Sequence, residues 1–296
     1  MVRIDRGDLR WWLVLLIGPL IVCTGERASA QDAETLRTQY VLLKAELSDS
    51  PFGRPLHLRS RDDGDELSGE VHAVIGQPHA VVGPALSGAL NWCEILILHL
   101  NVKHCLASRG GDALSLSVGR KHDVPLADVY RFEFRYRVVA AAQDYLQVAL
   151  DAVQGPVGTH DYRIVMEVTA LDAQRSFLRL SYAYRYGMVA RAGMHSYLAT
   201  LGRDKVGFSR VPTRDGSEPR YIGGTRGIIE RNTMRYYLAV EAYLGSLSLP
   251  ASARNEQRIR DWHEAVERYP RQLHELERDE YLQMKRREFD RQARLN

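Results

Sequence analysis

The feature that most constrains the fold is an alternating segment that runs from Val129 to Val139. Every second position carries an aromatic ring, at Tyr130, Phe132, Phe134 and Tyr136. The positions between them are charged, at Arg131, Glu133, Arg135 and Arg137. Because successive side chains of a strand point to opposite faces, this segment predicts a sheet with one covered face and one wet face. We expect its arginines to lie on a solvated outer face, with ion pairs to neighbouring strands.

Further segments with the same period follow at short intervals along the chain. They span residues 114–120, 145–150, 162–168 and 177–186. Because consecutive strands with short links pair with one another, these segments predict an antiparallel meander. An earlier alternating segment, Gly69 to Ile75, ends before Pro78 and predicts the first edge strand of the sheet.

Hydrophobic residues spaced by three and four predict helices before and after the meander. The first helix covers residues 31–48, and the charged residues 57–65 that follow predict a loop or a short edge strand. Small apolar residues from Ala80 to Leu90, interrupted by glycines and by Pro84, predict two short helical turns. Further helices are expected over residues 189–201, 227–247 and the charged stretch 251–296.

The order of these elements resembles the helix-grip fold of the START-like superfamily, which includes steroid and lipid carriers, plant pathogenesis-related allergens and polyketide cyclases. The likeness is carried by Glu70 to Ile75 with Pro78, the helical pair ending at Asn91 and Trp92, the meander from Leu114 to Tyr186 and the helix from Gly227. The helix over 189–201 and the tail after Pro250 depart from that pattern. The resemblance implies an α+β fold in which a curved antiparallel sheet packs on a long C-terminal helix, with extra C-terminal helices and an apolar cavity between sheet and helix.

A cavity in this position would be lined by the aromatic face of the sheet and by the facing side of the helix. The residues predicted to line it and to bind the ligand are Tyr130, Phe132, Phe134, Tyr136, Ile164, Met166, Tyr182, Tyr184, Tyr237 and Tyr243. The alternative is an ordinary core packed under the helix. So many tyrosines on one face favour a cavity with polar positions, because a buried hydroxyl is costly unless it finds a partner.

Residues 1–30 show the three-part pattern of a cleaved secretory signal. Basic residues precede an apolar run from Trp11 to Val22, and Ala28-Ser29-Ala30 offers the small residues that a signal peptidase reads. We therefore expect cleavage after Ala30 and a periplasmic or secreted protein. A lipoprotein signal at Cys23 and a retained N-terminal anchor are the alternatives.

The rest of the chain is expected to contain an N-terminal helix and linker (31–66), a START-like domain (67–250) and a charged helical extension (251–296). The whole chain carries a formal net charge of +3. This near-neutral balance does not indicate nucleic-acid binding. No segment beyond the signal is apolar enough to span a bilayer.

Two cysteines remain after the proposed cleavage site, Cys93 and Cys105. In an oxidising compartment two cysteines in one segment predict a disulfide, and two buried free thiols are the alternative. A metal site formed with His99 and His104 is disfavoured, because the spacing matches no zinc pattern and adjacent strand residues point in opposite directions. We predict no metal and no cofactor.

Three functions are compatible with these features. The first is a secreted protein that carries or senses a hydrophobic small molecule or lipid. The second is a cyclase or hydrolase in the same fold, which would need a polar cluster such as His99, Glu94 or Tyr182 pointing into the cavity. The third is an envelope assembly protein whose C-terminal helices contact a membrane surface or a partner protein. The sequence shows no nucleophile motif and leaves open whether the protein is an enzyme.

Overall fold

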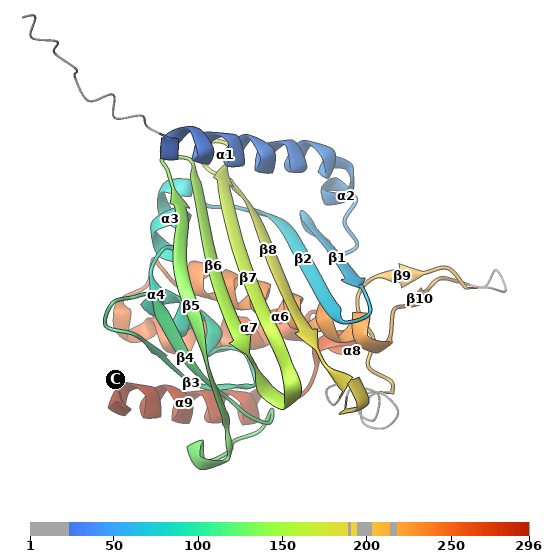
Figure 1. The fold of residues 1–296 in the computed structure, drawn as a ribbon, viewed down its shortest axis with the longest axis vertical. Coiled ribbons are helices and arrows are strands. Elements are labelled where there is room, and N and C mark those ends of the chain that lie inside the picture. The colour runs from blue at the N-terminus through green and yellow to red at the C-terminus, as the bar shows by residue number, and fades with distance from the viewer. Residues whose placement is uncertain (1–23, 189–190, 194–202, 214–217, 296) are drawn as a thin grey trace, which may run out of the picture.

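An eight-stranded antiparallel sheet forms the centre of the protein in the computed structural model, which describes residues 24–188, 191–193, 203–213 and 218–295 (Figure 1). In chain order the strands are β1 (Leu56–Asp62), β2 (Glu66–Ile75), β3 (Val102–Ala107), β4 (Ala113–Val118), β5 (Tyr130–Ala141), β6 (Tyr145–Gln154), β7 (Thr159–Ala170) and β8 (Ser176–Tyr186). Their order across the sheet is β1-β2-β8-β7-β6-β5-β4-β3. The unbroken pairing from β4 to β8 confirms the predicted meander, and β3 adds one more strand to it.

One edge of the sheet differs from the sequence prediction. β2 is not an edge strand, because β1 pairs with it from Leu56 opposite Ala73 to Asp62 opposite Leu67, and β8 pairs with its other side. β1 therefore takes the edge position, in the region predicted as a loop or a short edge strand. Its inward residues alternate with the charged residues that dominate the segment, which is why its strand character is weak in the sequence.

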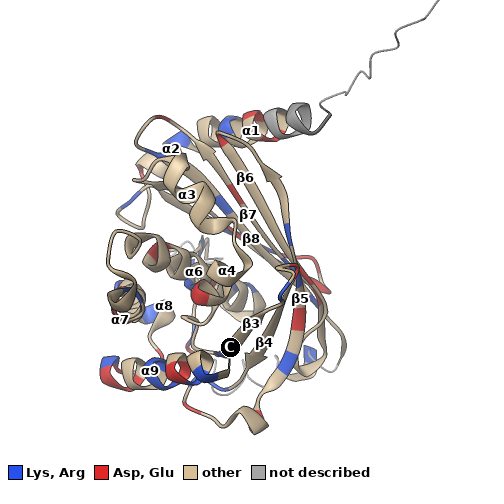
Figure 2. Cartoon of the chain, turned by 90° about the vertical axis from the view of Figure 1, so that its left-hand side faces the viewer, with Lys and Arg blue, Asp and Glu red and all other residues tan. Residues whose placement is uncertain are grey.

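The long helix α6 (Gly224–Gly245) packs against β1, β2 and β8, and the sheet curves around it (Figures 1 and 2). The closest approach is at Gly69, where an added Cβ would lie 2.3 Å from Oγ1 of Thr233. A glycine at this position lets the helix backbone approach the strand. This arrangement confirms the predicted α+β helix-grip class.

The other side of α6 is covered by the C-terminal helices α7 (Ala251–Glu267) and α8 (Pro270–Leu273), and the last helix, α9 (Arg278–Leu295), packs on α7. Arg231 and Arg235 are each only 3% exposed as a result, and Nε1 of Trp262 donates to the Arg235 carbonyl at 3.1 Å. α6 is thus buried on both sides. Residues 251–295 share one hydrophobic core with the sheet.

The last helix covers the other edge of the sheet, where α9 packs beside β3. The Lys285 ammonium donates to the carbonyls of His99 (2.8 Å) and Val102 (3.0 Å) and to Glu288 (2.7 Å). Lys103 forms a second ion pair with Glu288 at 3.1 Å, and all three charged side chains are fully buried. This network fixes α9 against the strand edge.

Two smaller groups of helices complete the structure. α1 (Thr24–Leu42) crosses the ends of β5 to β8, and α2 (Lys44–Ser48) follows it (Figure 1). The predicted helical pair appears as α3 (His79–Leu86) and α4 (Ala89–Leu96). Cys93 in α4 and Cys105 in β3 lie at disulfide distance, with their Cα atoms 5.2 Å apart.

Parts of the sequence predictions fall outside the described residues. These are residues 1–23 of the predicted signal and most of the helix expected over 189–201. Two short strands, β9 (Arg210–Val211) and β10 (Arg220–Tyr221), pair as a small antiparallel hairpin. Within the described ranges, no helix combines the length and apolar character that a membrane span requires.

Candidate functional site

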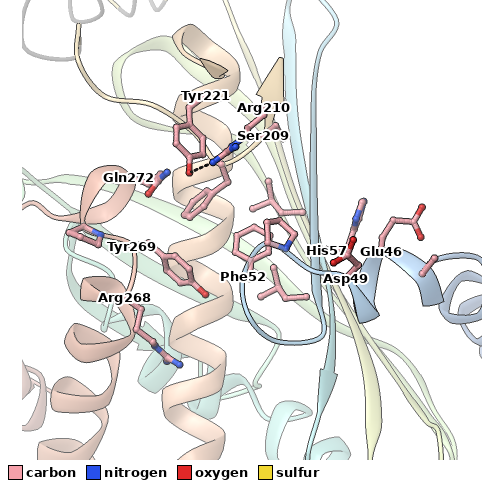
Figure 3. A pocket seen from close by; sticks show the side chains of 16 residues that line it. Glu46, Asp49, Phe52, His57, Ser209, Arg210, Tyr221, Arg268, Tyr269 and Gln272 are labelled. Carbon is pink, nitrogen blue, oxygen red and sulfur yellow. Dashed lines mark hydrogen bonds between the residues drawn. The ribbon is translucent and has the colours of Figure 1, made fainter. Parts of the chain in front are cut away.

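A pocket of about 820 Å³ lies at the free edge of β1 (Figure 3). Three parts of the chain form its walls. One wall is α2 with residues 51–58, the second is residues 208–210 with Tyr221, and the third is residues 268–272 between α7 and α8. Its volume is within the range of pockets that bind small organic molecules.

Three aromatic rings form the apolar floor of this pocket. Phe52, Phe208 and Tyr269 pack against one another with ring centroids 5.5 to 5.8 Å apart. Tilted and edge-on contacts at this distance are favourable for aromatic pairs. Leu56 and Leu58 of β1 extend the apolar surface beside these rings.

The loop that carries Phe52 is anchored to α6 by an arginine. Arg54 donates to Glu241 at 2.8 Å and also contacts the Tyr237 hydroxyl. At the start of the loop, the Ser50 hydroxyl donates to the Leu56 carbonyl at 2.5 Å. Because both ends are tied down, the floor is held in place without a ligand.

The segment that carries Phe208 is held by a buried carboxylate. Glu230 of α6 is fully buried and accepts hydrogen bonds from the backbone N–H groups of Phe208 (2.6 Å) and Ser209 (2.9 Å). It also accepts one from the Ser60 hydroxyl of β1 at 2.6 Å. Hydrogen bonds to an ionised group are stronger than neutral ones, so Glu230 ties together two walls of the pocket.

The edge strand presents unpaired backbone groups at the pocket. The pairing with β2 turns the N–H and C=O groups of Leu56, Leu58 and Ser60 outward. The carbonyls of Leu56 and Ser60 accept hydrogen bonds from Ser50 and Arg226. Leu58, which lines the pocket, has no further backbone partner among the described residues. Its N–H and C=O are therefore available to a ligand.

The charged residues of the lining are divided between two sides (Figure 3). Glu46 and Asp49 lie on the α2 side with His57, whose pKa is lowered by burial. Arg210 and Arg268 lie on the opposite side. The two sides therefore differ in charge, with the apolar floor between them.

Tyr221 on the basic side is in contact with two arginines. The guanidinium groups of Arg210 and Arg271 lie 5.0 and 4.9 Å from its ring centroid. Arg210 also donates to the Tyr221 hydroxyl at 3.4 Å, and this hydrogen bond lowers the pKa of the tyrosine. The positive charge of both arginines also favours the ionised phenol.

The residues predicted to bind the ligand lie elsewhere, and none of them lines this pocket. Tyr130 is 43% exposed and Phe132 is half-buried, whereas the other eight are buried: Phe134, Tyr136, Ile164, Met166, Tyr182, Tyr184, Tyr237 and Tyr243. Only Tyr237 is connected to the pocket, through its contact with Arg54. Ligand binding by the predicted set stays a prediction.

The buried rings of this set belong to a continuous aromatic layer beneath the sheet. Tyr162 contacts Phe132, Phe134, Tyr182 and Tyr184 with ring centroids 5.2 to 6.2 Å apart. The layer continues through Tyr182 to Tyr236 and His99. It is the packed interior between the sheet and α6.

Four tyrosines contribute hydroxyls to this interior, namely Tyr136, Tyr182, Tyr184 and Tyr236, and the buried Tyr136 hydroxyl has no hydrogen-bond partner among the described residues. Burial raises the pKa of Tyr136 to about 12 and raises the pKa of the other three further. These phenols are therefore neutral donors at physiological pH. An unpartnered buried hydroxyl costs free energy, so the Tyr136 hydroxyl destabilises this layer.

The opposite face of the sheet carries ion pairs, and among the arginines of the alternating segment Arg137 pairs with Asp151 at 2.5 Å. Arg179 pairs with Glu70 at 2.6 Å and with Glu167 at 2.5 Å. Arg163 and Arg185 both pair with Glu66. These partially exposed pairs form a solvated outer face.

Of the three residues named for a cyclase or hydrolase, His99 and Tyr182 both contact the ring of Tyr236, with ring centroids 4.8 and 5.1 Å apart. Burial lowers the pKa of His99. Glu94 forms an ion pair with Arg258 at 2.7 Å. No group of three or more His, Cys, Asp or Glu side chains suited to a metal occurs in the described part of the chain.

Sequence reasoning missed the pocket because its aromatic residues lie outside the periodic segments. Phe52 lies in a Ser-Pro-Phe-Gly turn and Phe208 precedes a polar loop, while Tyr269 precedes Pro270 at a helix end. The presence of aromatic residues in turns and at element ends was the one feature of the sequence that could have indicated the pocket. The meeting of these three rings depends on tertiary contacts, which the sequence pattern does not show.

Comparison with known proteins gives matches at the level of structure. No protein-family model and no curated protein sequence matches the chain. The Zhui aromatase/cyclase from Streptomyces sp. R1128 superposes with a TM-score of 0.37 and 16% identity, over 64% of this chain and 93% of that one. A START superfamily protein from Mycobacterium smegmatis superposes with a TM-score of 0.29 and 14% identity, over 47% of this chain and 93% of that one. Norcoclaurine synthase from Thalictrum flavum superposes with a TM-score of 0.32 and 12% identity, over 50% of this chain and 79% of that one.

Proposed function

We propose that the protein binds a hydrophobic small molecule in the pocket at the β1 edge. The observation that carries this proposal is a volume of about 820 Å³ above a floor of three packed aromatic rings. Burying apolar ligand surface against such rings is favourable at roughly 25 cal/mol per Å². The floor is held in place by Arg54 and Glu230, so little ordering free energy is lost on binding.

The proposal can be tested with a neutral fluorescent probe such as N-phenylnaphthylamine. We expect its emission to rise on binding to the purified protein and the rise to be lost in Phe52→Arg, which places a charge in the apolar floor. Val153→Arg is the matched control, because Val153 is 77% exposed on the sheet and outside the pocket wall. Equal probe binding by all three proteins would reject this site.

We also propose that the protein works outside the cytoplasm after cleavage behind Ala30. The three-part pattern of residues 1–30 and the approach of Cys93 to Cys105 support this. Cleavage would leave residues 31–42 of α1, whose Ala33 and Leu36 pack with Tyr145 and Phe177. N-terminal sequencing of the protein from the periplasmic or secreted fraction should begin at Gln31, and a full-length cytoplasmic protein would contradict the proposal.

The burial of the C-terminal helices favours a carrier function of the protein over a function in assembly through these helices. The apolar residues of α7 and α9, including Trp262, Tyr281 and Met284, are buried in the core of the same chain. They are therefore occupied by contacts within the chain.

A further inference from the structure

We propose that the ligand is an amphiphile with an anionic head group, bound with its head at Arg210 and its apolar part on the aromatic floor. This inference rests on the proposed function, because it assigns a chemical class to the ligand of the same pocket. It is carried by the charges around Tyr221 and their relation to the floor.

On the basic side of the pocket, two arginines without an ion pair among the described residues lie against one tyrosine ring. Arg163, Arg179 and Arg185 of the sheet each form an ion pair with a glutamate. By contrast, Arg210 and Arg271 form no ion pair among the described residues and both lie against the ring of Tyr221. Two like charges that share one neutral ring repel each other, and a bound anion would relieve that repulsion.

The third arginine of this side is only partly neutralised. Arg268 lies 3.7 Å from Glu241, but the same carboxylate is already bound by Arg54. One carboxylate therefore serves two arginines. The side of the pocket that contains Arg210 and Arg268 keeps an excess of positive charge, and a guanidinium matches the geometry of a carboxylate or phosphate.

The acidic side of the pocket gives the ligand a direction. Glu46 and Asp49 lie on the α2 side and would repel an anion there. Phe52 lies between the two sides (Figure 3). Together with Phe208, whose ring packs against it, it offers apolar surface to a chain. An anionic head is therefore favoured only at the arginine side, and the adjoining chain lies over the rings.

The test measures displacement of N-phenylnaphthylamine by ligands that share one apolar chain and differ in the head. Laurate and dodecyl phosphate carry an anion, whereas dodecanol is neutral. We expect both anions to bind at least about tenfold more tightly than dodecanol, with the preference reduced by added salt. The comparison of the two anions distinguishes a carboxylate head from a phosphate head.

The variants Arg210→Gln and Arg220→Gln provide matched charge changes. Arg220 is exposed in the same hairpin but does not line the pocket. We expect Arg210→Gln to weaken anion binding about tenfold without affecting dodecanol, and Arg220→Gln to change neither. Equal affinity for anions and dodecanol, or an equal effect of both variants, would overturn this inference while leaving the proposed function in place. Failure of the wild-type protein to bind the neutral probe would reject the proposed function itself.

Discussion

Gly69 of β2 and Thr233 of α6 meet where the sheet and the long helix come closest. The Thr233 hydroxyl donates to the Ile229 carbonyl within the helix at 2.8 Å, so its position is fixed. A Cβ at Gly69 would lie 2.3 Å from that oxygen and 3.2 Å from Cβ of Thr233. The space left by one missing side chain thus sets the distance between strand and helix.

We predict that Gly69→Ala destabilises the fold. Overpacking a closed contact typically costs about 1–3 kcal/mol, because the backbone must move apart. The free energy of unfolding from urea titration measures this loss. Gly76→Ala is the control, since nothing lies within 4 Å of its added Cβ, and it should leave stability unchanged or slightly raised. Equal effects of the two variants would show that the helix can shift freely.

We predict that Arg54→Met weakens probe binding as well as stability. The variant removes the anchor between the Phe52 loop and Glu241, at an expected cost of about 1–3 kcal/mol. Arg59→Met is the comparison, because Arg59 pairs with Glu70 on a more exposed face and should cost at most about 1 kcal/mol. Unchanged probe affinity in Arg54→Met would mean that the loop holds its position without this anchor.

The strands were predictable because a period of two is visible in the sequence itself. Tyr130 to Tyr136 show it without interruption, and β5 is found there. The edge strand β1 was ambiguous, because Arg59, Arg61 and Asp62 obscure its inward residues. The burial of Arg235 in α6 was not predictable, since it depends on Glu275, which lies 40 residues further along the chain and only 2.9 Å away in the fold.

The pocket is the part of the structure that sequence patterns do not encode locally. Phe52 and Tyr269 are separated by most of the chain, yet their rings are 5.8 Å apart. Tyr182 and Tyr184 of the predicted lining lie in the aromatic layer under the sheet, each 5% exposed.

The free energy of unfolding should fall as the pH falls from about 6.5 to 4, and His72 should account for part of this dependence on pH. Burial lowers the pKa of His72 to about 4, and neither of its ring nitrogens has a hydrogen-bond partner in the part of the chain that the structure describes. A lowered histidine pKa means that the unfolded state takes up the proton first. The stabilisation is therefore present above the unfolded pKa and is lost towards pH 4, by roughly 3 kcal/mol at most.

Urea unfolding at several pH values tests this expectation. His72→Phe should flatten the dependence of stability on pH, because phenylalanine binds no proton. The variant should still fold, since the neighbouring ring of Phe177 can pack against another aromatic side chain. His122→Gln, at an exposed position, should leave the slope unchanged. A slope that is the same in all three proteins would assign the acid sensitivity to other groups.

Two tyrosine hydroxyls should respond differently to removal. The Tyr281 hydroxyl donates to the Leu98 carbonyl at 2.9 Å, so Tyr281→Phe should cost about 1 kcal/mol or more. The Tyr136 hydroxyl is buried and has no partner among the described residues, so Tyr136→Phe should be neutral or stabilising. Thermal and urea unfolding compare the two variants. A clear loss of stability in Tyr136→Phe would reveal an ordered water or ligand bound to that hydroxyl.

Reduction of the bond expected between Cys93 and Cys105 should lower stability without removing ligand binding. The two residues are 12 positions apart, and closing a loop of similar length contributes about 3 kcal/mol in the chain-entropy account. They join α4 to β3 at one edge of the sheet, whereas the pocket lies at the β1 edge. Intact mass under non-reducing conditions, lower by two hydrogens than after reduction, establishes the bond. Urea unfolding of the oxidised and reduced protein then measures the effect on stability, and probe titration measures the effect on binding. Loss of probe binding in a reduced protein that is still folded would show that the disulfide supports the pocket.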